Sequence, residues 1–251
     1  MKVIKFLSLA LIIVSHIACN SDDDATILPN QNNIVVEEIL TIEDDRSALI
    51  EIYNANTNNT LGWDITTTDV STWGGVTVEN DRVAVLNIGQ TQVMNLPATA
   101  MQKLTELRHI LFNDNGITSL DISNNLKLID LFCSDNLLDE IDVSDNIKLE
   151  RLVCSLNKIK DLDISRNLDL YLLGGEHKLL NQLNLSLNKD LKRLSCGGNL
   201  FTSIDVSNNN ILEEFYAPDG NLESLNLSNN PKINYFVVSN NKLTFLDLRN
   251  G

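Results

Sequence analysis

The sequence has few of the residues that usually carry enzyme or metal chemistry. Its 251 residues include three His and four Cys, and 34 acidic side chains face 19 basic ones, for a net charge of −15. The His and Cys residues do not cluster, which disfavours a zinc site. No Ser-His-Asp set, glycine-rich phosphate loop or unique carboxylate pair is present. We therefore expect no enzymatic activity, no catalytic residue, no cofactor and no metal, and the acidity disfavours nucleic acid as a partner.

What the sequence does contain is a repeat of 21 residues that covers its larger part. Apolar residues recur at positions 1, 4, 6, 11, 14 and 16 of each copy. A fixed period near 20 residues is typical of a solenoid, in which each coil buries its apolar edge against its neighbours. Seven copies follow one another without insertion, and their first residues are Leu107, Leu128, Leu149, Leu170, Leu191, Leu212 and Ile233.

Two asparagine columns accompany the apolar ones. Position 9 is Asn in five copies and position 19 is Asn in six. A side-chain amide can satisfy backbone groups in a tight turn that no strand reaches, so both columns predict turns.

The motif LxxLxCxxNxL in Leu128–Leu138, followed by IDVSDN in Ile141–Asn146, resembles the leucine-rich repeat. It is most similar to the bacterial 21-residue type common in Bacteroidota. The resemblance implies an α/β-type repeat solenoid with a parallel β-sheet on its concave face and a second row of short extended segments opposite. It also implies a small helical N-terminal cap. We assign positions 2–8 of each copy to the main sheet.

The N-terminus predicts export and lipidation. Lys2 and Lys5 precede the apolar run Phe6–Val14, which is too short to span a membrane, so residues 1–18 are predicted to be a signal peptide. The small residue before Cys19 resembles a lipoprotein cleavage box, which implies that Cys19 carries the lipid; an ordinary secretion signal is the alternative.

Residues 19–33 are predicted to be an acidic flexible tether. Asn20–Asp24 resembles the tag that sends Bacteroidota lipoproteins to the cell surface, while a solvated acidic linker is the plainer interpretation. We thus expect an outer-membrane, lipid-anchored protein at the cell surface. Removing residues 1–18 takes away two lysines and leaves a charge of −17.

Residues 34–82 should form the N-terminal cap. Thr41 and Asp44 resemble a capping box at the start of a helix over Glu43–Asn54. Trp63 and Trp73 are expected to plug the open end of the core, and sugar binding is the alternative.

Residues 83–251 should form the solenoid, which opens with a repeat of 24 residues, 83–106. Its strand Val83–Ile88 aligns with Leu107–Phe112, and Ala98–Glu106 is predicted to be a short helix on the convex side.

Two columns of chemically active residues have structural interpretations. Cys133, Cys154 and Cys196 share position 6, where other copies carry apolar residues, so we expect buried thiols rather than disulfides. Asp recurs at position 15, with Ser at position 17 in six copies. The same Asp-x-Ser recurs in the consensus of the leucine-rich repeat that the chain resembles, which implies hydrogen bonding along the ladder; calcium binding is the alternative.

The variable positions 3 and 5 should face out of the main sheet and hold the binding residues. An apolar and aromatic stripe flanked by mixed charge fits a protein-binding patch, although β-propensity alone could also produce it. The rungs Gly174–Lys178 and Ala217–Gly220 disrupt the position 6–9 turn beside this face, which could shape a site. The predicted contacts are His109, Leu111, Asp130, Phe132, Arg151, Val153, Arg193, Tyr216 and Tyr235.

These features predict a surface protein that mediates recognition or adhesion, with another protein as its ligand. Glycan capture for a nutrient-uptake system is a second hypothesis, and a structural assembly subunit is a third. The last rung is expected to expose Phe236, Phe245 and Leu248, from which we predict a homodimer through the C-terminal end.

Overall fold

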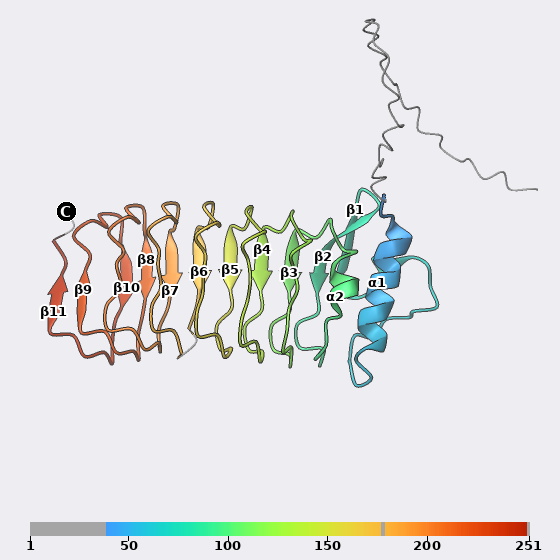
Figure 1. Cartoon of the computed structure of the whole chain (residues 1–251), viewed down its shortest axis with the longest axis horizontal. Coiled ribbons are helices and arrows are strands. Elements are labelled where there is room, and N and C mark those ends of the chain that lie inside the picture. Colours follow the sequence, from blue (N-terminus) through green and yellow to red (C-terminus); the bar gives the residue numbers. More distant parts are fainter. Residues whose placement is uncertain (1–38, 177–178, 250–251) are drawn as a thin grey trace, which may run out of the picture. The chain divides into compact units, whose positions relative to one another are not determined.

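The computed structural model of the protein describes residues 39–176 and 179–249. Within this part the coils stack side by side along one axis, from β2 at the N-terminal end to β11 at the other (Figure 1). The predicted signal peptide, Cys19 and the acidic tether lie outside the described residues. No helix in the described part is long and apolar enough to cross a membrane.

The main sheet has nine strands, and it confirms the predicted parallel solenoid. A short β1 pairs antiparallel with β2, and every later neighbour is parallel. Val85 pairs with His109 across the 24-residue repeat, and each further pair is offset by one 21-residue repeat, such as His109 with Asp130. The strands are β1 (Val76–Glu79), β2 (Arg82–Asn87), β3 (His109–Leu111), β4 (Asp130–Phe132), β5 (Arg151–Val153), β6 (Leu172–Gly174), β7 (Arg193–Ser195), β8 (Glu214–Tyr216) and β10 (Tyr235–Val237).

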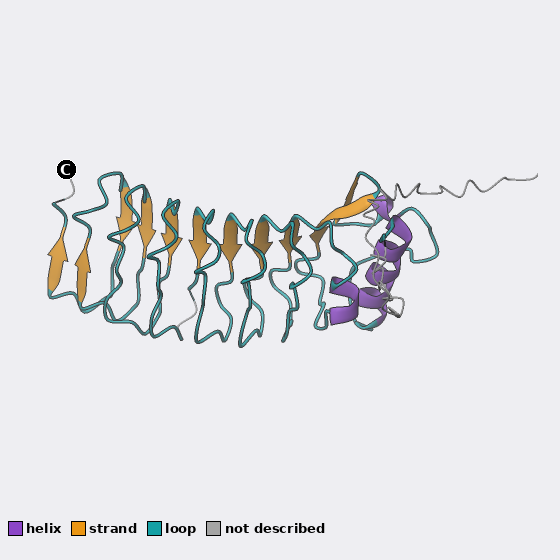
Figure 2. Ribbon diagram, turned by 45° about the horizontal axis from the view of Figure 1, so that its top comes forward, coloured by secondary structure: helices purple, strands orange, loops and turns teal. Residues whose placement is uncertain are grey.

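The second row is extended but forms strands only near the C-terminal end of the described residues. There β9 (Ser224–Asn226) and β11 (Phe245–Asp247) pair in parallel and form a separate two-stranded sheet. Figure 2 shows the main strands lined up in one row, with loops filling most of the opposite side. Sparse bonds link these loops between rungs, for example Lys158 N donating to Leu138 O at 2.7 Å.

The N-terminal part contains two helices and a short 3₁₀ turn, Val70–Thr72. Helix α1 (Ile42–Asn54) begins as predicted, because the backbone N–H of Thr41 donates to the Asp44 carboxylate at 2.7 Å. Helix α2 (Ala98–Met101) is shorter than the predicted Ala98–Glu106. The chain leaves the helix early because Leu104 and Leu107 must both turn into the core, where each is fully buried.

The apolar columns form one continuous core that runs the length of the stack. At its N-terminal end the rings of Trp63 and Trp73 stack 5.2 Å apart and are 4% and 3% exposed, which confirms their predicted role as a plug. The last described rung is open instead: Phe236, Phe245 and Leu248 are 38%, 53% and 43% exposed. The predicted dimer through this end stays a prediction.

Asparagine side chains satisfy backbone groups at the turns, as the two columns predicted, and the structure shows that they also bridge neighbouring rungs. At position 9, Asn157 Nδ2 donates to Cys133 O and Cys154 O at 2.9 and 3.0 Å, and its Oδ1 accepts from Leu138 N at 3.0 Å. At position 19, Asn167 Nδ2 donates to the carbonyls of Val143 and Asn146 at 3.0 and 2.9 Å. The Oδ1 of Asn167 is buried without a hydrogen-bond partner among the described residues.

The turns of the main sheet place position 8 in the left-handed region in every copy whose turn is described. Five of these six residues are Asp, Asn or Gly, which tolerate this conformation; the sixth is Leu156, at φ +56°. The position 8 residues are Asp114, Asp135, Leu156, Gly198, Asp219 and Asn240.

Candidate binding face

The outer surface of the main sheet, called here the sheet face, is built from positions 3 and 5 of the rungs. Position 4 points into the core, as in the fully buried Ile110 and Leu152, so its two neighbours point outward. The most exposed aromatic residues on this face are Tyr216 on β8, at 37%, and Tyr235 on β10, at 54%. The prediction that this column of residues faces outward is therefore confirmed for most of its members.

Asp130 is the exception, and it corrects the prediction of an exposed contact. It is 1% exposed because two neighbours close over it. His109 Nδ1 lies 2.5 Å from one carboxylate oxygen of Asp130, and Arg151 Nε donates to the other at 2.5 Å. The hydrogen bond to Asp130 raises the pKa of the Arg151 guanidinium. Asp130 thus positions its neighbours and is not itself available to a ligand.

Arg151 is held over an aromatic ring at the same place. Its guanidinium carbon lies 5.5 Å from the centre of the Phe132 ring, within cation–π range. The side chains of Arg151 and His109 remain 38% and 32% exposed. Together His109, Phe132 and Arg151 present a fixed, partly apolar platform across β3, β4 and β5.

A hollow of about 400 Å³ opens on the sheet face further along the stack. Its cause is Gly174, which supplies no side chain at position 5, followed by the small Ser195 on the next strand. Val153 closes one end of the gap and Tyr216 the other. A Cβ at Gly174 would lie 2.9 Å from Val153 Cγ1, so even alanine would crowd this space.

The walls of the hollow carry charge on both sides. On one side Arg193 Nε lies 3.1 Å from Glu214 Oε1, so these charges compensate each other locally. On the other side the Ser195 hydroxyl donates to the Glu176 carboxylate. Glu176 forms no ion pair within residues 39–176 and 179–249.

The structure brings four of the predicted contacts together around this hollow: Val153, Arg193, Tyr216 and Tyr235. It gathers His109, Asp130, Phe132 and Arg151 in the platform, and Leu111 sits beside them on β3, in register with Phe132. Eight other lining residues were not among the predicted contacts: Ser155, Leu172, Leu173, Gly174, Glu176, Leu194, Ser195 and Glu214. The sequence signal for Gly174 and Glu176 was the irregular rung Gly174–Lys178, which interrupts an otherwise regular column.

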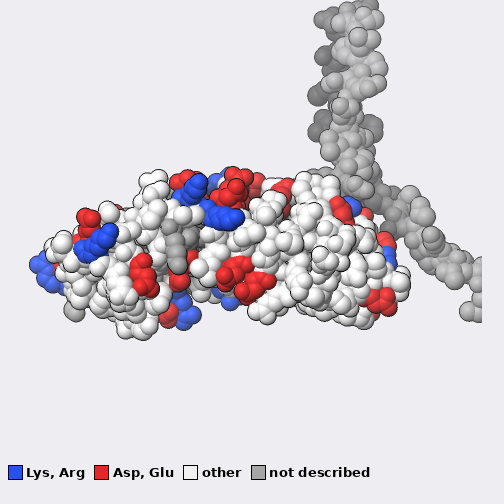
Figure 3. Space-filling model, turned by 90° about the horizontal axis from the view of Figure 1, so that it is seen from below, with Lys and Arg blue, Asp and Glu red and all other residues white. Residues whose placement is uncertain are grey.

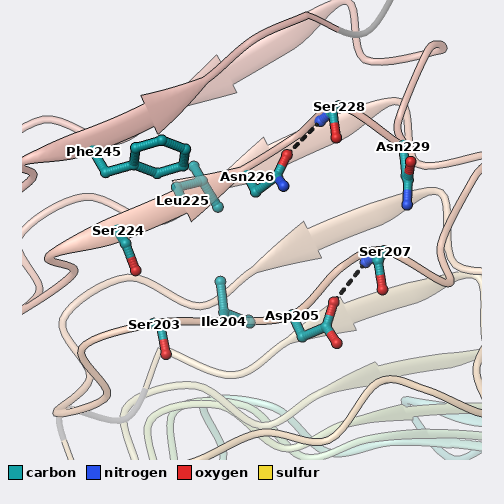
Figure 4. Close-up of a pocket in the computed structure, with 10 residues that line it drawn as sticks. All are labelled: Ser203, Ile204, Asp205, Ser207, Ser224, Leu225, Asn226, Ser228, Asn229 and Phe245. Carbon is teal, nitrogen blue, oxygen red and sulfur yellow. Dashed lines mark hydrogen bonds between the residues drawn. The ribbon is translucent and has the colours of Figure 1, made fainter.

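The opposite row of the solenoid also holds grooves between its rungs, and two of them, of about 550 and 440 Å³, are at least as large as the hollow on the sheet face. A smaller one, of about 260 Å³, lies between Ser203–Ser207, Ser224–Asn229 and the exposed ring of Phe245. Figure 4 shows the Asp205 and Asn226 side chains turned toward the following serines rather than into a shared cluster.

The position 15 carboxylates form hydrogen bonds, but within their own turns rather than along the ladder as predicted, because the Ser two residues on offers the nearest amide. Asp163 Oδ1 accepts from Ser165 N at 2.9 Å, and Asp121 accepts from both the amide and the hydroxyl of Ser123. These bonds to the charged form lower the pKa of Asp121, Asp142, Asp163 and Asp205. In the described part of the chain no three His, Cys, Asp or Glu side chains converge in a way that could hold a metal ion.

The position 6 cysteines are core residues. Cys133, Cys154 and Cys196 are at most 1% exposed, and the structure joins none of these three by a disulfide. Burial raises the pKa of the Cys133 thiol to about 12 and also raises those of the other two. Thiols of this kind are poor nucleophiles.

Charge is distributed in small mixed groups. Figure 3 shows basic (blue) and acidic (red) side chains next to one another, separated by wide uncharged areas, on the side viewed there. Mixed charge around neutral surface suits a protein interface better than the uniform positive surface that nucleic acid requires.

Sequence comparisons find limited similarity. No protein-family profile matches the chain. Over 75 residues, the chain is 35% identical to the probable inactive receptor kinase RLK902 of Arabidopsis thaliana. This match covers 30% of the chain and only 12% of the kinase.

Solved structures show a broader likeness. The functional domain of InlJ from Listeria monocytogenes, which includes a cysteine ladder, matches with a TM-score of 0.52 and 29% identity, over 63% of this chain and 40% of that one. The Leptospira interrogans leucine-rich-repeat protein LIC12759 matches with a TM-score of 0.59 and 18% identity, over 65% and 45% of the two chains.

A chain in the octameric complex of Latrophilin 3, Unc5D and the leucine-rich repeats of FLRT2 matches at 0.56 and 21% identity, over 65% and 56%. The chain therefore spans less than two thirds of each of these proteins. Its parallel sheet, its 21-residue register and these neighbours establish that the protein has the leucine-rich-repeat fold.

Proposed function

We propose that this chain is a lipid-anchored cell-surface protein that recognises another protein through its sheet face. One observation carries the proposal: exposed aromatic side chains and a hollow interrupt a face whose rungs are otherwise regular. Exposed Tyr and Arg residues beside a concave pocket are typical of the residues that dominate binding energy at protein interfaces.

The neighbouring structures support a protein as the ligand. FLRT2 matches as part of an assembly with two other proteins. Leucine-rich repeats serve many partners, so the fold supports a recognition role and leaves the ligand open. The face itself favours a protein over a glycan, because the floor of the hollow is glycine and serine and one of its ends is Val153, rather than flat aromatic rings.

The anchor belongs to the same proposal and rests on the sequence around Cys19. An apolar run of the length of Phe6–Val14 followed by a small residue and Cys supports processing as a lipoprotein. Labelling cells that express the chain with a fatty-acid analogue should mark the wild type and not Cys19→Ala. Label on both would remove the anchor from the proposal without affecting the binding face.

A parallel screen tests recognition. The purified chain is offered extracellular proteins and a glycan array, and each hit is measured again with Phe132→Ala and Tyr235→Ala. Loss of a central aromatic contact should weaken a protein ligand by about tenfold or more.

Phe245→Ala is the matched control for Tyr235→Ala, because Phe245 lies on the opposite row and is about as exposed as Tyr235, at 53% against 54%. A protein hit that depends on Phe245 and ignores the other two substitutions would contradict recognition through the sheet face. A glycan that binds equally well to all three variants would support carbohydrate capture in place of protein recognition.

A further inference from the structure

The hollow beside Gly174 has two properties that together select one class of side chain. It is a slot two rungs wide, about 10 Å at a strand spacing near 4.8 Å, bounded by Val153 at one end and Tyr216 at the other. Its floor is the Gly174 backbone and Ser195, and Leu172 forms part of one wall. A slot of this form accepts an extended side chain lying along the sheet.

The charges of the slot favour a cation. Arg193 is compensated by Glu214 at 3.1 Å, and among the described residues Glu176 forms no ion pair, so Glu176 is the carboxylate that a ligand can pair with. Ser195 donates to Glu176, and Ser195 is in register with Tyr216 on the next strand. The carboxylate and the aromatic ring therefore lie on either side of the same serine.

A long basic side chain matches all of these features. Its methylene stem can lie on aliphatic surface while its charged end reaches polar groups, as lysine and arginine do elsewhere. Arginine fits better than lysine, because a planar guanidinium can pair with a carboxylate and stack on a ring at the same time. The overall charge of −15 also attracts a basic partner.

We propose that the Gly174 slot binds an arginine side chain presented by the partner protein. The stem lies on Val153 and Leu172, and the guanidinium pairs with Glu176 and stacks on Tyr216. This inference rests on the proposed recognition of a protein by the sheet face, and it identifies the residue that the partner contributes.

The test is a titration of the isotope-labelled full-length chain with Nα-acetyl-arginine methylamide, followed through backbone amide shifts. The neutral isostere Nα-acetyl-citrulline methylamide and the apolar Nα-acetyl-leucine methylamide serve as comparison probes. We expect weak binding in the millimolar range, with shifts centred on Gly174, Glu176 and Ser195.

Glu176→Gln should weaken the arginine probe by about tenfold, because it removes a charge-assisted bond and keeps the shape of the side chain. Glu223→Gln is the matched control: it makes the same change at an exposed site beside β9, on the opposite row, and should leave binding unchanged. Tyr216→Ala should also weaken binding.

Three results would overturn the proposal: no shift in the slot, equal shifts with leucine or citrulline, or arginine shifts that Glu176→Gln leaves intact. None of them removes the proposed function. If Tyr235→Ala abolishes binding of a protein ligand from the screen and Glu176→Gln does not, recognition through the sheet face is supported and arginine binding in the slot is refuted.

Discussion

The two asparagine columns should differ in how much stability they provide, and two residues of one rung make the comparison direct. Asn157 and Asn167 belong to the same copy of the repeat and are 8% and 1% exposed. Asn157→Ala removes two donated bonds to buried carbonyls, a longer part-buried bond of 3.2 Å to Ser155 O, and one accepted bond. Three buried groups, the Leu138 amide and two carbonyls, then lack that partner. Asn167→Ala removes only two donated bonds.

The expected costs follow from counting these groups. At about 1–1.5 kcal/mol for each buried polar group that loses its partner, Asn157→Ala should cost about 3–4 kcal/mol. Asn167→Ala should cost about 2–3 kcal/mol, and less where the loss of its unpaired buried Oδ1 offsets part of that. The more buried asparagine should therefore be the less costly one to remove, by about 1 kcal/mol.

Urea unfolding followed by circular dichroism measures the difference, with the exposed Asn181→Ala as control. For a unit of this size, 1 kcal/mol corresponds to about 2–4 °C in Tm. An equal or greater cost at Asn167 would refute the reasoning, because burial rather than the number of satisfied partners would then decide the contribution.

Three further predictions follow from the same structure. Leu156→Asn should stabilise the protein by about 1 kcal/mol, because Leu156 is held at φ +56° where most other rungs carry Asp, Asn or Gly; an unchanged Tm would contradict this. Cys133, whose pKa is raised to about 12, should not react with a thiol reagent at neutral pH until the protein is unfolded, and fast labelling of the native protein would show that the core opens. The free energy of unfolding should fall in acid. Hydrogen bonds in the turns lower the folded-state pKa of the position 15 aspartates, and that of Asp247 to about 2. These carboxylates therefore contribute their full stabilisation above the ordinary pKa near 3.8, and they lose it as the pH falls from about 4 toward 2. Replacing Asp163 with Asn, which keeps the acceptor and cannot titrate, should reduce this acid sensitivity, and an unchanged acid transition would contradict it.

The regular part of the fold was predictable because the 21-residue period itself states which residues, far apart in the sequence, pair in the sheet. Once Leu107 and Leu128 occupy the same position, a parallel ladder offset by 21 residues follows, and the pairing of His109 with Asp130 was implied by the repeat alone. The alignment of β2 with β3 across a longer repeat was predictable for the same reason. The short extent of α2 was not, because it depends on how far the chain must travel to bury Leu104.

Side-chain relations between rungs were not predictable from the columns. The position 3 column predicts that Asp130 faces outward, but it does not predict that His109 and Arg151 bond to it from the two neighbouring rungs. The buried pair of Asp45 and Arg82, which joins α1 to β2 at 2.8 Å, escaped notice for a similar reason, because the two residues are 37 positions apart and belong to no repeat.

Regularity in this fold also limits where specificity can be stored. The residue at position 4 of each rung packs into the core, so changing it costs stability before it changes a ligand. Positions 3 and 5 lie outside the apolar core, and there the rungs differ most: Gly174 follows Val153, and Tyr216 follows Ser195. A missing side chain between larger ones creates a hollow without disturbing the ladder beneath it, since Leu173 and Leu194 remain buried at 1% and 2%. A small residue at an outward position can thus create a binding hollow in a repeat protein with little loss of stability, and Gly174 is such a residue.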